Sequence, residues 1–448
     1  MVLAVVAFGV ASCSGSSEPE LSAPATTTKP PVPSVPPGPA PAPGAETLDR
    51  VAALDGHLAI VDGPTVVVTE PDGDGAIPVD GGGDTVAAQP VWSHDGRRLA
   101  WSRAAVTGHA LVVHDLADGT ELVSDAPGPP TFYLQWSGDD ATLASLRNAT
   151  AGGGIELGVA TPGDPIVPVA VTAPFYVSWA PTEAVLAAHV ASTEVVLVAG
   201  RPGAGIAGGL LVERSGPFTV PAWLDDATVV AVGPEGLARF DVTGGAAQVL
   251  GGTTEPIRFV VSPDRTRIAY QLEAPTGGPS AVVLPRGPTA PAQDDPPTTD
   301  GGASEGGPAD GGQGAGSGLV VLDLATGEQT VVATDPALAW EWSPDGARLA
   351  WLAPSPGPFP ETVRWQFWDG GAPTSSMPYV PSATVLGAYL PFFEQYAQSH
   401  TGWSPDGSAF AFAGRPRVTD DDGIWVQPIG VAGPPVRVAD GDAVTWGR

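Results

Sequence analysis

The sequence has 448 residues, 49 acidic and 19 basic, so its formal net charge is −30. This charge argues against a nucleic-acid partner, because binding to a phosphate backbone needs clustered Arg and Lys. A single cysteine excludes a disulfide framework and a cysteine-rich zinc site, whereas 43% hydrophobic residues are enough for a substantial core.

The first 13 residues have the features of an export signal. Val2 to Val10 form an apolar run with the length of a signal-peptide core, shorter than the about 20 residues that span a bilayer. The run ends in Val10-Ala11-Ser12-Cys13, which resembles the lipobox of bacterial lipoproteins. The resemblance implies that residues 1–13 are a lipoprotein signal peptide and that Cys13 is acylated, which would anchor the protein to the membrane.

Residues 14–48 are rich in Ser, Thr, Pro and Ala, with the run KPPVPSVPPGPAPAPG at their centre. This composition cannot bury apolar surface and favours extended polyproline II, so we expect a disordered stalk. The lipid anchor, the stalk and a folded region over residues 49–448 together predict an extracytoplasmic protein that is held to the cell membrane.

The rest of the chain repeats one motif, Trp-Ser-x-Asp-Gly-x-x-Leu-Ala. The anchor position, occupied by Trp in all copies but one, recurs at Trp92, Trp136, Trp179, Trp223, Val261, Trp342, Trp403 and Trp446. The spacings between anchors are 44, 43, 44, 38, 81, 61 and 43 residues. The shorter spacings match the about 40–45 residues of one propeller blade, and the two long ones contain insertions.

Each copy of the motif predicts antiparallel strands joined by tight turns. Asp-Gly between two apolar runs indicates a turn in which Gly supplies the positive φ. Such a unit cannot bury both faces alone, so the copies must stack, which predicts an all-β ring of four-stranded blades. A single strand begins at Ala443, and the region from Leu54 lacks a preceding Trp strand. We expect these two ends to pair in one blade and close a β-propeller of eight blades, with seven as the alternative.

The best copies, Trp342 to Trp351 and Trp403 to Phe412, resemble the TolB-like propeller repeat (PD40), which is a WD40-like repeat of bacterial envelope proteins and peptidases. The resemblance covers about residues 50–448 outside the two insertions. It implies a propeller fold and a location in the cell envelope, and it leaves the activity open.

Two insertions interrupt the repeats. Residues 286–318 are nearly all Gly, Pro, Ala, Asp, Thr and Ser, which predicts a disordered loop. Their Gly-x-Ser-x-Gly at residues 302–306 is no nucleophile elbow, because neither the strand before it nor the helix after it is expected.

The second insertion, residues 372–399, is rich in aromatic side chains. Ser382 could cap a short helix, and Pro391 should kink or split it. One interpretation is a cap that packs on the propeller. The other is a docking surface for a protein or sugar ligand, and for this surface we select Tyr389, Phe392, Phe393 and Tyr396.

The titratable residues show no catalytic or metal-binding pattern. The six histidines lack paired metal spacing, and the recurring aspartates fit structural turns: Asp95, Asp139, Asp264, Asp345 and Asp406. Residues 72–75 and 420–423 are only fragments of calcium loops. We therefore predict no catalytic residues, no metal site and no cofactor, with calcium left open as an alternative.

Two functions fit these features. The first is a non-catalytic platform that binds an envelope protein or a small ligand, which agrees with the uninterrupted repeats and the aromatic insertion. The second is an extracytoplasmic hydrolase or lyase that acts on a glycan or peptide at the mouth of the propeller channel.

Overall fold

A computed structural model describes residues 42–448, except for residues 81–83, 107, 127, 151–152, 173–175, 192, 201–208, 216–218, 252–256, 273–317, 356–361, 418 and 432. The predicted signal peptide with Cys13, the predicted stalk up to residue 41, and all but the last residue of the 286–318 insertion therefore lie outside the described residues. The unit that contains the described residues spans Ala40–Arg448.

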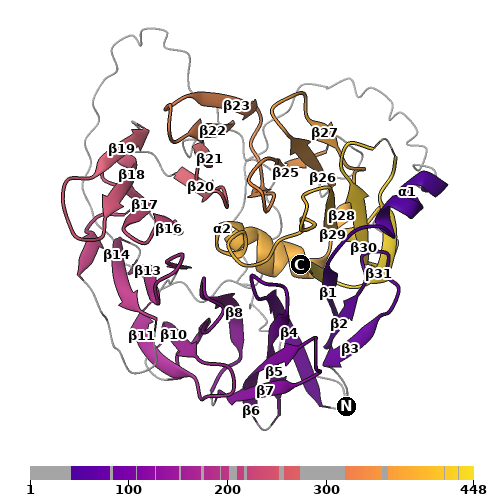
Figure 1. The fold of residues 1–448 in the computed structure, drawn as a ribbon, viewed down its shortest axis with the longest axis horizontal. Helices are drawn as coiled ribbons and strands as arrows, with labels where there is room; N and C mark the ends of the chain where they lie inside the picture. Colours follow the sequence, from indigo (N-terminus) through magenta and orange to yellow (C-terminus); the bar gives the residue numbers. More distant parts are fainter. Residues whose placement is uncertain are drawn as a thin grey trace, which may run out of the picture. The chain divides into compact units, whose positions relative to one another are not determined.

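The described residues form eight four-stranded antiparallel sheets, which follow one another around a ring (Figure 1). Blade 1 contains β1 (His57–Asp62), β2 (Thr65–Thr69), β3 (Ile77–Asp80) and β32 (Ala443–Gly447). Blade 2 contains β4 (Thr85–Trp92), β5 (Arg98–Ala105), β6 (Gly108–Asp115) and β7 (Glu121–Asp125). Blade 3 contains β8 (Thr131–Trp136), β9 (Leu143–Asn148), β10 (Ile155–Ala160) and β11 (Val167–Thr172). Blade 4 contains β12 (Tyr176–Trp179), β13 (Val185–Val190), β14 (Glu194–Ala199) and β15 (Leu210–Val212).

The second half of the ring repeats the same arrangement. Blade 5 contains β16 (Ala222–Asp225), β17 (Thr228–Gly233), β18 (Gly236–Asp241) and β19 (Gln248–Gly251). Blade 6 contains β20 (Ile257–Val261), β21 (Arg267–Leu272), β22 (Leu319–Asp323) and β23 (Gln329–Ala333). Blade 7 contains β24 (Ala339–Trp342), β25 (Leu349–Pro354), β26 (Val363–Trp368) and β27 (Thr374–Ser375). Blade 8 contains β28 (Val380–Pro381), β29 (Ala409–Arg415), β30 (Gly423–Pro428) and β31 (Val436–Asp440).

Blade 1 closes the ring by joining the two ends of the repeat region. The strand β32 pairs antiparallel with β1, and Trp446 lies opposite Leu58. This pairing confirms the predicted closure and the count of eight blades, and it excludes the alternative of seven. The helix α1 (Ala45–Val51) precedes β1 and contacts β30 and β31 of blade 8, with Val51 fully buried. The helix thus begins inside the range predicted as stalk.

Each Ser-x-Asp-Gly turn is held by its own side chains. The hydroxyl of Ser343 donates to Asp345 Oδ1 at 2.6 Å and accepts from the backbone N–H of Arg348 at 2.8 Å. Gly346 has a φ of +67°, which favours glycine. The same serine–aspartate bond occurs at Ser93, Ser137, Ser262 and Ser404. The recurring aspartates are therefore turn formers, as predicted.

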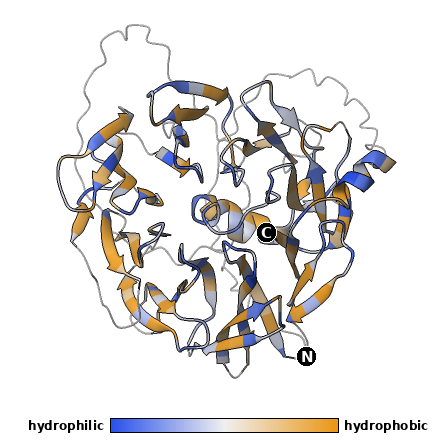
Figure 2. Ribbon diagram, in the orientation of Figure 1, coloured by the Kyte–Doolittle hydropathy of each residue, from blue (hydrophilic) through white to orange (hydrophobic). Residues whose placement is uncertain are grey.

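The Trp anchors connect adjacent blades. The indole N–H of Trp136 donates to the carbonyl oxygen of Val91, the residue before the anchor of the preceding blade, at 3.2 Å. Equivalent bonds of 2.9–3.4 Å join Trp92 to Thr445, Trp179 to Gln135, Trp223 to Ser178, Trp342 to Val260 and Trp403 to Glu341. In blade 6 Val261 replaces Trp, so this interblade donor is missing there. Buried apolar residues of adjacent blades form shared clusters, such as Val91, Leu111 and Trp136. Figure 2 shows hydrophobic residues along many strands and hydrophilic ones in many of the connecting turns.

The aromatic insertion leaves the sheet from the innermost strand of blade 8. The chain pairs with β29 at Val380 and Pro381, departs, and returns at Trp403, which forms an isolated bridge with Phe410. We call the intervening residues 382–402 the channel segment, because its helix α2 (Phe393–Tyr396) lies in the middle of the ring (Figure 1). The channel segment begins later than the predicted insertion 372–399, because residues up to Pro381 still belong to blades 7 and 8.

The channel segment changes helix type twice along its length. It contains the π-helix η1 (Val385–Tyr389), the 3₁₀-helix η2 (Leu390–Phe392) and then α2. The hydroxyl of Ser382 accepts from the N–H of Val385 at 3.1 Å, which confirms the predicted cap. Pro391 lies in η2, where the regular helix is interrupted as predicted. Within the described part of the chain, no helix has the length and apolarity needed to cross a bilayer.

Candidate binding pocket at the mouth of the channel

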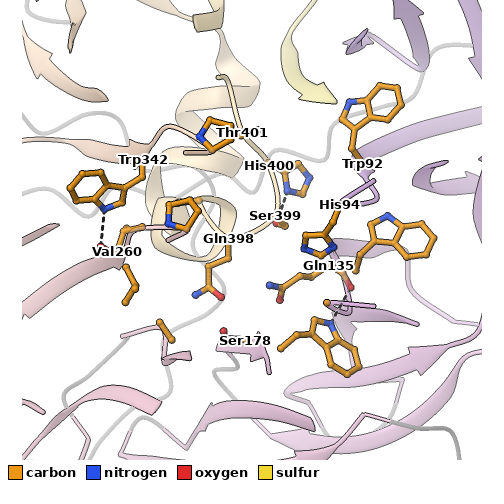
Figure 3. Close-up of a pocket in the computed structure, with 18 of the residues that line it drawn as sticks. Trp92, His94, Gln135, Ser178, Val260, Trp342, Gln398, Ser399, His400 and Thr401 are labelled. Atoms are coloured by element: carbon orange, nitrogen blue, oxygen red, sulfur yellow. Dashed lines mark hydrogen bonds between the residues drawn. The ribbon is translucent and has the colours of Figure 1, made fainter. Parts of the chain in front are cut away.

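A pocket of about 460 Å³ opens at the end of the channel where the Ser-x-Asp-Gly turns lie. Its walls come from the inner strands and turns of the surrounding blades, and the last residues of the channel segment form part of its lining (Figure 3). This size falls in the range of small-molecule sites. The segment thus converts an axial channel into a cavity that can hold a ligand.

The residue before each Trp anchor contributes to the pocket wall. Successive side chains of a strand point to opposite faces, so this residue lies on the face opposite its anchor. The residues at this position that line the pocket are Val91, Gln135, Ser178, Ala222 and Val260. The wall therefore combines three apolar side chains with one amide and one hydroxyl.

Three polar side chains extend into this space from different elements. Gln135 comes from β8, Ser178 from β12 and Gln398 from the channel segment, and Figure 3 shows them around the same opening. Among the described residues, the Gln135 side-chain oxygen is buried without a hydrogen-bond partner. Gln398 donates its amide N–H to the carbonyl oxygen of Pro221 at 3.3 Å, which leaves its own carbonyl oxygen as an acceptor.

A hydrogen-bond chain that begins in the pocket lining, at Ser399 and His400, fixes the tautomer of His400. Tyr133 donates its hydroxyl to the carbonyl oxygen of Gln395 at 3.1 Å. Ser399 Oγ therefore donates to the Tyr133 oxygen at 2.9 Å. Since the serine proton is used in this way, His400 Nδ1 must be the donor in its 2.7 Å contact with Ser399 Oγ. Nε2 of His400 then carries a lone pair, and burial lowers the pKa of this imidazole to about 3.

The nearby carboxyl groups are each engaged or neutral. Glu394, in α2, pairs with Arg258 at 3.2 Å, and the guanidinium also lies over the ring of Phe393. Burial raises the pKa of Glu341 to about 8, although the N–H of Gly402 donates to its carboxyl group. At neutral pH the larger part of Glu341 is therefore protonated. In the described part of the chain, no group of three or more His, Cys, Asp or Glu is placed to hold a metal ion.

The four aromatic residues selected from the sequence differ in exposure. Phe393 is 5% exposed, and its ring centroid lies 4.5 Å from that of Trp340. Tyr396 is 7% exposed and stacks on the half-buried Tyr389 at 4.3 Å. Phe392 is 47% exposed. Phe393 and Tyr396 are thus buried, Tyr389 is half-buried, and Phe392 is the most exposed of the four.

Sequence reasoning missed Gln135, Ser178 and Gln398. For the first two a signal existed, because each stands directly before a Trp anchor and so occupies a channel-facing position in the repeat. For Gln398 no comparable signal exists, because its position depends on the path of the channel segment.

The closed ring of eight four-stranded sheets makes the chain an eight-bladed β-propeller. No family model and no curated protein matches it. Among solved structures it is similar to TolB from Acinetobacter baumannii, with 12% identity and a TM-score of 0.37 over 88% of this chain and 66% of TolB. It is also similar to an oligogalacturonate lyase in complex with manganese, with 11% identity and a TM-score of 0.45 over 81% of this chain and 82% of the lyase.

A third similar structure is the dihydro-heme d1 dehydrogenase NirN, with 13% identity and a TM-score of 0.47 over 86% of this chain and 74% of NirN. At these identities the similarity concerns the propeller fold alone. The activities of these proteins differ, so the function of this chain has to be argued from its own pocket.

Proposed function

We propose that the protein is a lipid-anchored β-propeller of the bacterial cell envelope that binds a ligand, without transforming it, at the mouth of its channel. The observation that carries the binding role is the pocket of about 460 Å³, lined by polar side chains from separate blades and from the channel segment. A rigid ring with a preformed concave site is suited to recognition, because little conformational entropy is lost on binding.

The arrangement of Ser399 and His400 supports binding over hydrolysis. The two side chains lie 2.7 Å apart, which is the separation of a nucleophile and its base. A general base must accept the serine proton, yet here the imidazole donates and the serine proton goes to Tyr133. An imidazole with a pKa of about 3 is also a weak base at neutral pH. The hydrolase or lyase interpretation therefore stays the second candidate.

The location rests on the sequence of the first 48 residues. An apolar run that ends in a lipobox-like Cys13 and a proline-rich stalk are the features that support an anchored, extracytoplasmic protein. Replacement Cys13→Ala should move the protein from the membrane fraction to the soluble fraction. Retention of the Cys13→Ala variant in the membrane fraction would contradict the anchor.

The binding role can be tested with the full-length protein in detergent. Extracts of the cell envelope are screened for compounds that raise its melting temperature, with Ser178→Phe as the variant that fills the pocket. Ser375→Phe, on the exposed strand β27, is the matched control. A ligand that stabilises the wild type and the control but not Ser178→Phe supports the proposal. The absence of any such ligand, or turnover of a glycan or peptide by purified protein, overturns it.

A further inference from the structure

On the basis of the proposed function, we infer that the ligand of the channel-mouth pocket is an uncharged sugar of one or two units. The inference rests on three properties of the pocket lining: the lack of an unpaired charge among its buried side chains, its mixture of hydrogen-bond donors and acceptors, and its apolar wall. Each property selects against a different class of ligand.

No buried side chain of the pocket wall offers an unpaired charge, and the two arginines that line the pocket, Arg265 and Arg448, are exposed to solvent. The carboxylate of Glu394 is paired with Arg258, and Glu341 is held largely protonated. Asp140, at the neighbouring turn, accepts from the N–H of His94 at 2.9 Å and contacts its ring at 2.7 Å. An ammonium group placed between the amides would therefore lose its hydration without gaining an ion pair. For an anion, the attraction of Arg265 and Arg448 is screened by water at their exposed positions, and the net charge of −30 opposes its approach.

The polar groups that line the pocket can both donate and accept. Gln135 supplies an amide and Ser178 a hydroxyl. Gln398 supplies its side-chain carbonyl oxygen, because its side-chain N–H already donates to the carbonyl oxygen of Pro221. Within the described residues, neither the Gln135 amide nor the Ser178 hydroxyl has a protein partner. A sugar hydroxyl donates and accepts at the same atom, so adjacent hydroxyls can satisfy an amide and a hydroxyl together.

The remaining wall suits the carbon face of a sugar ring. Val91, Ala222 and Val260 line the pocket between the polar positions. The Trp anchors also line the pocket, but most of their indole N–H groups are engaged in the interblade hydrogen bonds that hold the ring together. The cavity volume of about 460 Å³ leaves room for one or two sugar units and excludes a long polymer from lying inside it.

The experiment is a calorimetric titration of the full-length protein in detergent with matched sugars. The probes are methyl glucoside, N-acetylglucosamine and maltose as neutral ligands, glucuronate as the anion and glucosamine as the cation. We expect a neutral sugar to bind at least about tenfold tighter than its charged counterparts, because an unpaired buried charge is unfavourable.

Two pocket variants and one control locate the site. Ser178→Ala removes one hydroxyl with little change in volume and should weaken neutral-sugar binding by about fivefold to tenfold. Gln135→Glu should weaken neutral sugars and make glucosamine the preferred ligand, because it places a carboxylate in the pocket. Gln248→Glu, on the exposed part of β19, should change neither. Melting curves confirm that each variant is folded.

Tighter binding of glucuronate, or equal loss in Gln248→Glu, would overturn the inference. If no sugar binds while the envelope screen yields another pocket ligand, the sugar assignment fails and the binding function stands. A neutral peptide amide found in that screen would be such a ligand. If neither the sugars nor the screen gives a ligand, both proposals fail.

Discussion

Gln395 and Val177 are 218 residues apart in the sequence and form a pair of hydrogen bonds inside the channel. The Gln395 side-chain oxygen accepts from the Val177 N–H at 2.8 Å, and the side-chain N–H₂ donates to the Val177 carbonyl oxygen at 2.8 Å. The amide thus pairs with the inner strand β12 as a neighbouring strand would. This contact, together with the Glu394–Arg258 ion pair, ties the channel segment to blades 4 and 6.

We expect Gln395→Leu to lower the free energy of unfolding by about 2–4 kcal/mol, because two buried backbone groups of Val177 lose their partners. Urea denaturation of the variant and of Gln248→Leu, an exposed glutamine on β19, measures the effect. If the two variants unfold at the same urea concentration, the channel segment does not stabilise the ring.

The hydrogen bonds that the Trp anchors donate to the preceding blade predict that loss of one indole N–H lowers the stability of the protein. Trp136→Phe should destabilise the protein by about 1–3 kcal/mol, because the carbonyl oxygen of Val91 loses its interblade donor. Trp368→Phe is the matched control, since within the described residues its indole makes no hydrogen bond. Thermal melting of both variants gives the comparison. An equal loss in the two would assign the effect to ring volume and would contradict a role for the bond.

Blade 3 contains a buried ion pair between adjacent strands, in which Arg147 Nε donates to Glu156 Oε1 at 2.8 Å. Glu156→Leu should cost about 3–5 kcal/mol, because it leaves a buried guanidinium without its charge partner. The double variant Arg147→Leu/Glu156→Leu should recover much of this loss. Chemical denaturation of the two variants and the wild type tests the coupling, and an additive loss in the double variant would refute it.

The raised pKa of Glu341 predicts that the folded protein loses stability as the pH rises above neutrality. Its folded-state pKa of about 8 lies above the ordinary value of 4.5, so the folded protein holds a proton that the unfolded chain releases. This contribution is fully present below pH 4.5 and is lost as the pH rises through 8. Melting temperatures of wild type and Glu341→Gln should therefore diverge between pH 6.5 and 9, with the variant changing less. Parallel curves would show that Glu341 is not the group responsible.

The low pKa of His400 affects the stability of the protein in a different pH range from that of Glu341. Its folded-state pKa of about 3 lies below the ordinary 6.5, so its contribution is present above pH 6.5 and is lost as the pH falls through 3. Measurements above pH 6.5 consequently isolate Glu341 from His400.

The ring could be predicted from the sequence because its determinants are local. The bonds that hold a Ser-x-Asp-Gly turn span five residues or fewer, as from Ser343 to Arg348, so the motif carries its own geometry. The regular spacing of Trp then gives the number of blades, and the incomplete motif at each end gives the closure between β1 and β32.

The channel segment could not be placed in this way, because its contacts join positions that no short pattern relates. Tyr133 reaches Gln395 across 262 residues, and Tyr396 reaches the carbonyl oxygen of Phe132 across 264. Aromatic composition indicated burial or docking equally well, and only the path of the chain places Phe393 and Tyr396 inside. The pocket was missed for the same reason, since the channel segment supplies part of its lining.

The position of β1 has a mechanical consequence. This strand is held on both sides, by five residue pairs with β2 and five with β32. A pull applied to the chain ahead of α1 and directed along β1 would load both ladders in shear, so that many hydrogen bonds resist together instead of separating one after another. The blade that joins the two ends of the ring is therefore also the one suited to carry tension applied to the chain ahead of α1.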